Sequence, residues 1–215
     1  MKKIMCVFGT RPEAIKMAPV VLALKENRKE FKVKVVLTAQ HREMLDQVIK
    51  IFKIDVDYDL NLMQNTQTLY YITTNGLNKL STVIKKERPD LILVHGDTTT
   101  TFVATLAGFY EQIPVGHVEA GLRSFDKMNP YPEEINRLLT DSICDLHFAP
   151  TRCARENLLK ENRKKSGIFV TGNTVIDALH MISEMELSFS HPSLRRIFSS
   201  QDIDRYKIIL VTAHR

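Results

Sequence analysis

Short apolar runs alternate with polar motifs along this chain, and each motif stands where a run ends. The motifs are GTRPE (9–13), GDTTT (96–100), HVEAGLR (117–123), PEEINR (132–137) and TAHR (212–215). In a parallel α/β sheet the carboxyl ends of the strands meet at one crevice, so motifs far apart in sequence can share one ligand. We therefore predict a binding or active site at one edge of a parallel sheet.

The alternation predicts repeated strand–helix units. Strands are expected over residues 3–8, 33–38, 91–94, 114–118, 146–149 and 168–171. Helices are expected after Pro12, from near His41, over 66–86, 98–111, 133–144 and 151–161, and from 173 or 174 onward. Repeated units with short connections indicate a Rossmann-like, doubly wound parallel sheet.

The organisation of the chain changes after Gly172. A serine-rich stretch at 188–200 reads as a loop with at most a short helix, and 207–212 reads as a buried strand that opens a new unit. We expect an N-terminal domain over 1–172 and an incomplete start of a C-terminal nucleotide-binding domain over 173–215. A natural domain is not expected to stop one strand into a new unit.

Composition excludes several classes of protein. The 215 residues are 44% apolar and 26% charged, which suffices for a real core. Apolar runs fall short of the roughly 18 residues that a membrane span needs, and the first run is too short for a signal peptide. Three cysteines without a CxxC pair argue against a disulfide framework or a zinc knuckle and favour the cytoplasm. The net charge of +5 comes from scattered basic residues, so no nucleic-acid partner is expected.

Glycine spacing rules out two common phosphate motifs. The eight glycines form no GxGxxG, and the segment from Gly116 to Gly121 continues with Leu122-Arg123 instead of Lys-Ser/Thr. The turn at 9–12 remains a candidate, because free backbone N–H groups, a helix dipole and Arg11 can together hold a phosphate. An ordinary strand–helix turn explains Gly9 and Pro12 equally well.

Acidic residues follow two of the predicted strands. Asp97 and Glu119 are expected to point into the same crevice, where paired carboxylates can take different pKa values suited to proton transfer. The alternative for Asp97 is an N-cap on the helix beginning at Thr98. Glu133 and Glu134 lie in the first turn of a helix, where compensation of the helix dipole is a sufficient explanation.

Two histidine–acid pairs offer a metal site as an alternative. His95 and Asp97, and likewise His117 and Glu119, are separated by one residue at strand ends that can lie close together. The same residues are equally suited to supporting the acids by hydrogen bonding.

The motifs together resemble the non-hydrolysing bacterial UDP-N-acetylglucosamine 2-epimerases over essentially the whole chain. The matching segments are GTRPEAIKMAP (9–19), TAQHREML (38–45), HGDTTTTF (95–102), PVGHVEAGLRS (114–124), YPEEINR (131–137), FVTGNTVIDAL (169–179) and VTAHR (211–215). The hydrolysing epimerases of sialic-acid pathways share the fold and much of the acid set, but the GTRPEAIK opening is more similar to the non-hydrolysing branch.

The resemblance implies a two-domain fold of the glycosyltransferase-B type with the active site between its halves. It implies interconversion of UDP-GlcNAc and UDP-ManNAc, through elimination and re-addition of UDP, for cell-surface polysaccharide. No redox cofactor or metal is required by that route, and a homodimer is expected.

The resemblance also implies roles for individual residues. The implied acid/base and catalytic residues are Asp97, Glu119, Glu133 and His214, with His214 facing the pyrophosphate, and the implied substrate-binding residues are Arg11, Lys16, Gln40, His41 and Arg137. A second nucleotide-sugar site is implied near Gln40, His41 and the loop before Glu133. Because the second domain of the family carries most of the uridine site, we expect the 215-residue chain alone to be nearly inactive. A hydrolysing epimerase and a glycosyltransferase of the same fold remain the alternatives.

Overall fold

The computed structural model describes residues 1–39, 42–64, 68–185 and 192–198, together with 207, 209 and 211. The chain divides into two compact units, residues 1–179 and 180–215. The two units are described separately below.

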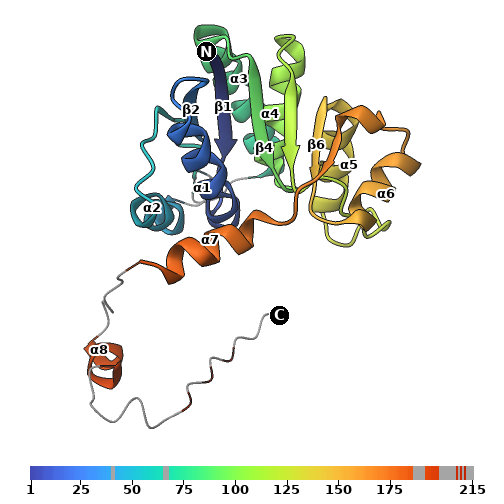
Figure 1. Ribbon diagram of the computed structural model, residues 1–215. Coiled ribbons are helices and arrows are strands. Elements are labelled where there is room, and N and C mark those ends of the chain that lie inside the picture. Colours follow the sequence, from blue (N-terminus) through green and yellow to red (C-terminus); the bar gives the residue numbers. More distant parts are fainter. Residues whose placement is uncertain are drawn as a thin grey trace. The chain divides into compact units, whose positions relative to one another are not determined.

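The first unit alternates strands and helices as the sequence predicts (Figure 1). Its strands are β1 (Lys2–Phe8), β2 (Phe31–Leu37), β3 (Tyr58–Asp59), β4 (Leu91–His95), β5 (Val115–Val118), β6 (Leu146–Ala149) and β7 (Ile168–Val170). Its helices are α1 (Arg11–Glu26), α2 (Arg42–Ile51), α3 (Leu69–Glu87), α4 (Thr99–Tyr110), α5 (Glu133–Ile143), α6 (Arg152–Lys160), the 3₁₀ turn η1 (Lys165–Gly167) and the start of α7 (Thr174–Ser183). The predicted bounds agree within a few residues.

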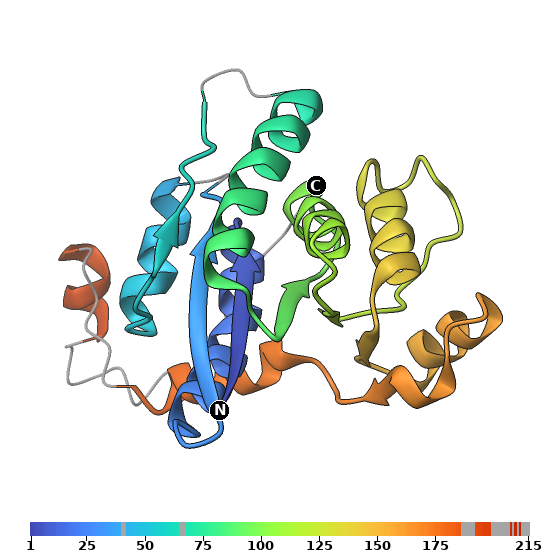
Figure 2. The same cartoon turned by 90° about the horizontal axis from the view of Figure 1, so that it is seen from above.

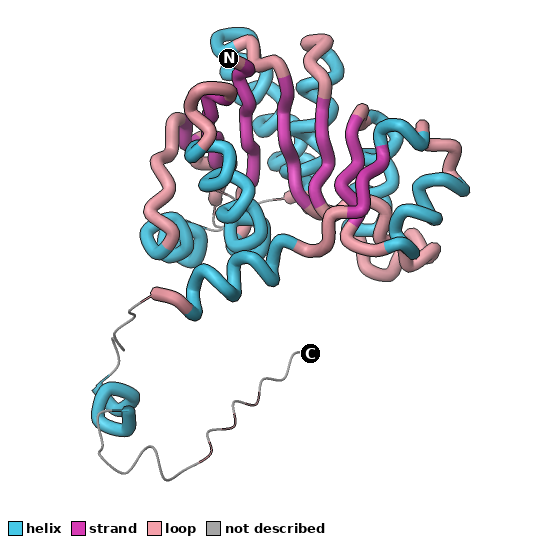
Figure 3. Tube along the Cα trace, viewed as in Figure 1, coloured by secondary structure: helices cyan, strands magenta, loops and turns pink. Residues whose placement is uncertain are grey.

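The strands pair in parallel in the order β3-β2-β1-β4-β5-β6-β7 (Figure 3). Helices α3, α4 and α5 lie on one face of the sheet, and α1 lies on the other (Figures 1 and 2). This is a doubly wound α/β sheet, which confirms the predicted fold class. In this topology the loops after β1, β4 and β5 come to the same edge of the sheet.

Strand β3 is a strand that the sequence did not predict, and the short turn η1 was not predicted either. Strand β3 has two residues, Tyr58 and Asp59, which pair with Val36 and Leu37 of β2. Two residues are too few to produce a readable alternation of apolar and polar side chains.

The main core lies between β1, β4 and the helices α3 and α4. Buried side chains of the strands meet buried side chains of the helices; these include Met5, Val7, Ile92, Val94, Leu80, Ile84, Val103 and Ala104. Strands that are covered on both faces read as continuous apolar runs, which is why the sequence identified them.

The second unit contains the end of α7 and the short helix α8 (Pro192–Phe198). Helix α8 falls where the sequence allowed a short helix. The strand expected over 207–212 lies mostly outside the described residues. Across the part of the chain that the structure describes, none of the helices has the length and apolar character needed to cross a membrane.

Two glycines with the same backbone conformation provide a test of the packing. Gly121 and Gly172 have φ of +82° and +80°. A Cβ at Gly121 would lie 2.8 Å from Leu158 Cγ and would clash with the carbonyl oxygen of Ala154 in α6, whereas a Cβ at Gly172 meets no described atom within 4 Å. We predict that Gly121→Ala lowers the free energy of unfolding by about 1–3 kcal/mol more than Gly172→Ala, because only Gly121 adds overpacking to the shared strain. Urea unfolding of both variants measures the difference; equal losses would contradict the tight packing at Gly121.

Candidate active site

Four charged side chains meet at the carboxyl edge of the sheet. Lys16 comes from α1, Asp97 from the loop after β4, Glu119 from the end of β5, and Arg137 from α5. These residues, called the charged cluster below, are drawn from four parts of the chain, as the sequence predicted for motifs at the ends of parallel strands. The predicted proximity of Asp97 and Glu119 is thus present in the structure, where both carboxylates lie close to Arg137.

Arg137 lies between the two carboxylates of the cluster. Its Nη2 donates to Oδ2 of Asp97 and lies 3.8 Å from Oε1 of Glu119, while its Nη1 donates to the backbone carbonyl of Glu119 at 2.5 Å. The Arg137 residue is 6% exposed. A planar guanidinium can serve two oxygen acceptors at once, which an ammonium on a flexible stem does less well. Arg137 thus fixes both the backbone and the carboxylate environment of Glu119.

Glu119 is held on the other side by two nitrogen donors. Oε2 of Glu119 accepts from Lys16 Nζ at 2.5 Å and from Asn173 Nδ2 at 2.9 Å. The residue is buried and has φ of +67°, a conformation that is uncommon for a residue with a side chain. Such strain persists where the surrounding contacts enforce it, and it concentrates at functional sites. Glu119 is therefore the most constrained carboxylate of the cluster.

The capping alternative for Asp97 does not hold. The N-cap of α4 is Thr98, whose hydroxyl accepts from the Thr101 N–H at 3.2 Å. Asp97 precedes the cap and pairs with Arg137 instead. Its side chain is 32% exposed and lines a cavity of about 210 Å³ together with Glu133 and Arg137.

The turn at residues 9–12 is not an open phosphate loop. The N–H groups of Gly9 and Thr10 donate to Oε2 of Glu13 at 2.9 and 2.7 Å, so they are not free for a ligand. Oε1 of Glu13 accepts from the Thr98 hydroxyl at 2.6 Å, which ties α1 to α4. Burial raises the pKa of Glu13, although these donors partly oppose the rise. The predicted phosphate site is therefore wrong in part. Arg11 remains available to a phosphate, but the N–H groups of Gly9 and Thr10 are already occupied by Glu13.

A buried network below the cluster holds the end of β5. His117 Nδ1 lies 2.6 Å from Oδ1 of Asp141, and His117 Nε2 lies 2.7 Å from the Gly96 carbonyl oxygen. Oδ2 of Asp141 accepts from Arg123 Nη2 at 2.7 Å and from Gly121 N–H at 3.1 Å. Burial alone would raise the pKa of Asp141, but His117 and Arg123 outweigh it and lower the pKa well below the usual range. The network fixes Gly96 and Gly121 on either side of the cluster.

The same network argues against the metal alternative. Both ring nitrogens of His117 lie within hydrogen-bond distance of an oxygen, Oδ1 of Asp141 and the Gly96 carbonyl, so neither faces an open position for a metal. The described residues contain no group of three or more His, Cys, Asp or Glu side chains arranged to hold a metal ion. His117 therefore acts as a support for the strand ends.

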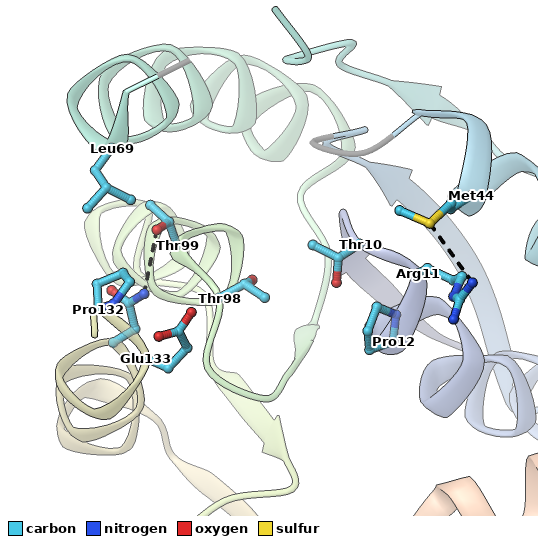
Figure 4. Close-up of a pocket in the computed structure, with 10 residues that line it drawn as sticks. Thr10, Arg11, Pro12, Met44, Leu69, Thr98, Thr99, Pro132 and Glu133 are labelled. Atoms are coloured by element: carbon cyan, nitrogen blue, oxygen red, sulfur yellow. Dashed lines mark hydrogen bonds between the residues drawn. The ribbon is translucent and has the colours of Figure 1, made fainter. Parts of the chain in front are cut away.

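An open cavity of about 410 Å³ lies beside the cluster (Figure 4). Its lining comes from α2 and from the starts of α1, α3, α4 and α5. Thr10, Arg11, Pro12 and Met44 lie on one side, and Leu69, Thr98, Thr99, Pro132 and Glu133 lie on the other. Within the described residues the Arg11 guanidinium contacts the sulfur of Met44 through Nη1 at 3.9 Å and pairs with no carboxylate, so its charge is available to an anion. The cation of Arg11 and the carboxylate of Glu133 thus line the same cavity, which is suited to a small polar ligand.

Glu133 and Glu134 have different environments. Glu134 is buried and accepts from the Ser124 and Phe125 N–H groups at 3.0 and 2.9 Å, which anchors the loop before α5. Glu133 lines both cavities. The structure thus separates a supporting carboxylate from one that a ligand can reach.

Some predicted residues cannot be placed, and others were missed. Gln40, His41 and His214 lie outside the described residues. From the sequence, residue Asn173 was expected only as a possible first residue of a helix, and Glu13 was not singled out. Asn173 follows β7 closely, so the rule that placed Asp97 and Glu119 at strand ends would also have found it.

The fold and the cluster define a class: a doubly wound α/β protein with carboxylates and cations gathered at the carboxyl edge of its sheet. Residues 23–215 match the family model described as UDP-N-acetylglucosamine 2-epimerase. The UDP-N-acetylglucosamine 2-epimerase of Bacillus subtilis is 57% identical over 99% of this chain and 54% of the relative, and that of Escherichia coli K12 is 54% identical over 99% and 57%. This chain belongs to the UDP-N-acetylglucosamine 2-epimerase family, and it spans about half the length of the curated relatives it matches.

Solved structures agree with this assignment. A crystal structure of UDP-N-acetylglucosamine 2-epimerase matches with a TM-score of 0.85 and 58% identity, over 91% of this chain and 54% of that one. The Neisseria meningitidis enzyme, bound to UDP-GlcNAc, matches with a TM-score of 0.80 and 51% identity, over 94% and 52%. The galactosyltransferase WaaB, at 12% identity over 80% and 46% and a TM-score of 0.57, shares the fold alone, as expected for a glycosyltransferase-B type of architecture.

The buried network predicts how the free energy of unfolding changes when the negative charge of Asp141 is removed. Asp141→Asn leaves Arg123 and His117 without their common anion, so we predict a loss of about 3–5 kcal/mol in the free energy of unfolding at pH 7. Asp55→Asn is the matched control, because the Asp55 side chain is 96% exposed in its pair with Lys25, and little change is expected. Urea unfolding measures both.

The pH dependence of the free energy of unfolding provides a second test of the role of Asp141. Because the folded-state pKa of Asp141 is lowered, its ionised form stabilises the fold above about pH 4, the usual value in unfolded chains, and the contribution disappears as the pH falls through the folded-state value. The difference in the free energy of unfolding between the native chain and Asp141→Asn should therefore decrease below pH 4. A difference that stays constant with pH would contradict the assigned charge of Asp141.

Proposed function

We propose that this chain supplies the N-terminal part of a UDP-N-acetylglucosamine 2-epimerase that interconverts UDP-GlcNAc and UDP-ManNAc by elimination and re-addition of UDP. Family membership supports the proposal, and so do the related solved structures of the Neisseria meningitidis enzyme bound to UDP-GlcNAc and of S. aureus MnaA with UDP. The observation that carries it in this structure is Glu119, a strained and buried carboxylate held between Lys16, Asn173 and Arg137.

The chemistry requires such a carboxylate. The C2 proton of the sugar has no adjacent carbonyl to acidify it, so cleavage of the anomeric C–O bond must lead. UDP leaves with the bonding electrons while a carboxylate takes the C2 proton, and a C1–C2 double bond forms. Return of a proton to the opposite face of C2, with attack of the UDP oxygen on C1, gives the epimer. Cations are needed at the departing pyrophosphate, where negative charge develops.

We assign the residues of this site to two tasks, which are proton transfer at C2 and binding of the pyrophosphate. Glu119 is our first choice for removing the C2 proton, with Asp97 and Glu133 completing the acid/base set. Arg11 and Lys16 are proposed to bind the phosphate region. Arg137 is proposed to orient Asp97 and Glu119, because it contacts both.

Several parts of the proposal concern residues or properties beyond the described structure. We propose that His214 faces the pyrophosphate, and that Gln40 and His41 belong to a second nucleotide-sugar site beside the loop before Glu133. Residues 1–172 are proposed as the N-terminal domain and 173–215 as the beginning of the nucleotide-binding domain. The cytoplasmic location, the homodimer and the role in cell-surface polysaccharide stay predictions.

The activity is tested in a joined protein, in which the 215-residue chain is followed by the part of the Bacillus subtilis relative that it does not cover. Proton NMR in D₂O should show deuterium entering C2 of UDP-GlcNAc while UDP-ManNAc grows to equilibrium. Glu119→Gln should slow this exchange by about 10²–10⁴-fold, the usual contribution of a positioned proton acceptor. Glu156→Gln on the outer surface of α6, where the side chain is 55% exposed, is the matched control and should leave the rate unchanged.

Other outcomes lead to other functions. Free ManNAc and UDP would indicate the hydrolysing reaction. A folded joined protein that binds UDP-GlcNAc and exchanges no C2 proton would contradict the epimerase and favour a transferase. The 215-residue chain alone is expected to show little turnover, because its relatives are nearly twice as long.

A further inference from the structure

His95 is a buried histidine without a hydrogen-bond partner on its ring. It ends β4, is 3% exposed, and neither ring nitrogen has a partner in the part of the chain that the structure describes. Buried polar groups are nearly always paired, because an unpaired one loses its bonds to water without replacement. The position of such a group beside a candidate catalytic carboxylate calls for a functional explanation.

The acceptor beside the His95 ring is the carboxylate of Glu119. Nε2 of His95 lies 3.9 Å from Oε2 of Glu119, about 1 Å beyond hydrogen-bond distance. Burial, followed by the charges of Lys16, His117 and Arg137, holds the pKa of His95 well below its usual range. The ring is therefore neutral, with one N–H donor and one lone pair.

Lys16 and Asn173 already donate hydrogen bonds to the Glu119 oxygen that lies near the His95 ring. Oε2 of Glu119 already accepts from Lys16 Nζ at 2.5 Å and from Asn173 Nδ2 at 2.9 Å. The ammonium therefore occupies the carboxylate oxygen that lies nearest to the His95 ring. The Lys16 ammonium is also well suited to a phosphate, since its side chain is 23% exposed.

We propose that His95 is a positioning residue that takes over Glu119 from Lys16 when the substrate binds. This inference rests on the proposed epimerase function. As Lys16 turns toward the diphosphate of the nucleotide sugar, the Glu119 carboxylate moves about 1 Å and accepts from the Nε2–H of His95. The His95 donor then fixes the orientation of the Glu119 carboxylate toward the sugar in place of the ammonium.

The exchange of donors is tested first on the 215-residue chain, without any turnover. Two-bond ¹H–¹⁵N correlation spectra report the protonation and hydrogen bonding of the His95 ring. Lys16→Met removes the competing ammonium, so the His95 Nε2 proton should shift downfield and exchange more slowly with water. Lys25→Met, on the same helix and paired with Asp55, is the matched control and should leave the ring unchanged. Adding Glu119→Ala to Lys16→Met should abolish the shift.

Kinetics of the joined protein supply the second test. His95→Phe should lower kcat by about 100-fold with little change in KM, since misplacing a reacting group by 1 Å costs about that much. His95→Gln keeps a side-chain N–H donor and should restore most of the rate. A merely structural histidine would not show this recovery.

Each result decides the proposal. Ring signals of folded Lys16→Met that match those of the native chain would overturn it, as would equal kcat values for His95→Phe and His95→Gln. If the joined protein with unchanged sequence fails to turn over UDP-GlcNAc, the proposed function fails, and the spectra of the 215-residue chain still decide whether His95 replaces Lys16 on Glu119.

Discussion

The site depends on one guanidinium that lies between two carboxylates. Asp97 and Glu119 are brought to one edge by the parallel sheet, where their charges would repel, and Arg137 offsets that repulsion by contacting both. Arg137 is delivered by α5, whose buried face carries Glu134, Arg137 and Asp141 at spacings of three and four residues. Each contacts a different segment: the loop before α5, the charged cluster, and the end of β5. One polar helix face thus organises the whole carboxyl edge of the sheet.

The two most buried carboxylates of this edge show how partners determine charge. Glu13 accepts from backbone N–H groups and a threonine hydroxyl, which are neutral, and burial therefore raises its pKa. Asp141 is buried to a similar degree but faces Arg123 and His117, and its pKa is lowered. A neutral donor thus leaves a buried carboxylate a stronger base than a cation does.

The sequence predicted the fold and the gathering of Asp97 and Glu119, because both follow from apolar runs and from where the runs end. It did not predict that Glu13 would occupy the N–H groups of the first turn, although the Thr10-x-x-Glu13 spacing is that of a capping box. The contact of Glu13 with Thr98, in contrast, depends on how α1 packs against α4. The sequence left open the alternative in which Asp97 caps α4, whereas the structure has Thr98 in that position. Side-chain partners across elements are set by tertiary packing, which periodicity does not contain. The polar face of α5 could have been predicted from the three- and four-residue spacing of its polar side chains, but a search for apolar periodicity does not detect it.

The most direct test of the role of Arg137 is a double-mutant cycle on the free energy of unfolding of this chain. Asp97→Asn and Arg137→Met are measured singly and together in urea. If Arg137 holds Asp97 as the structure shows, Arg137→Met should be less damaging in the Asp97→Asn background, with a coupling energy between about 0.5 and 3 kcal/mol. Additive losses, within about 0.3 kcal/mol, would show that the two side chains act independently and would contradict the central place of Arg137.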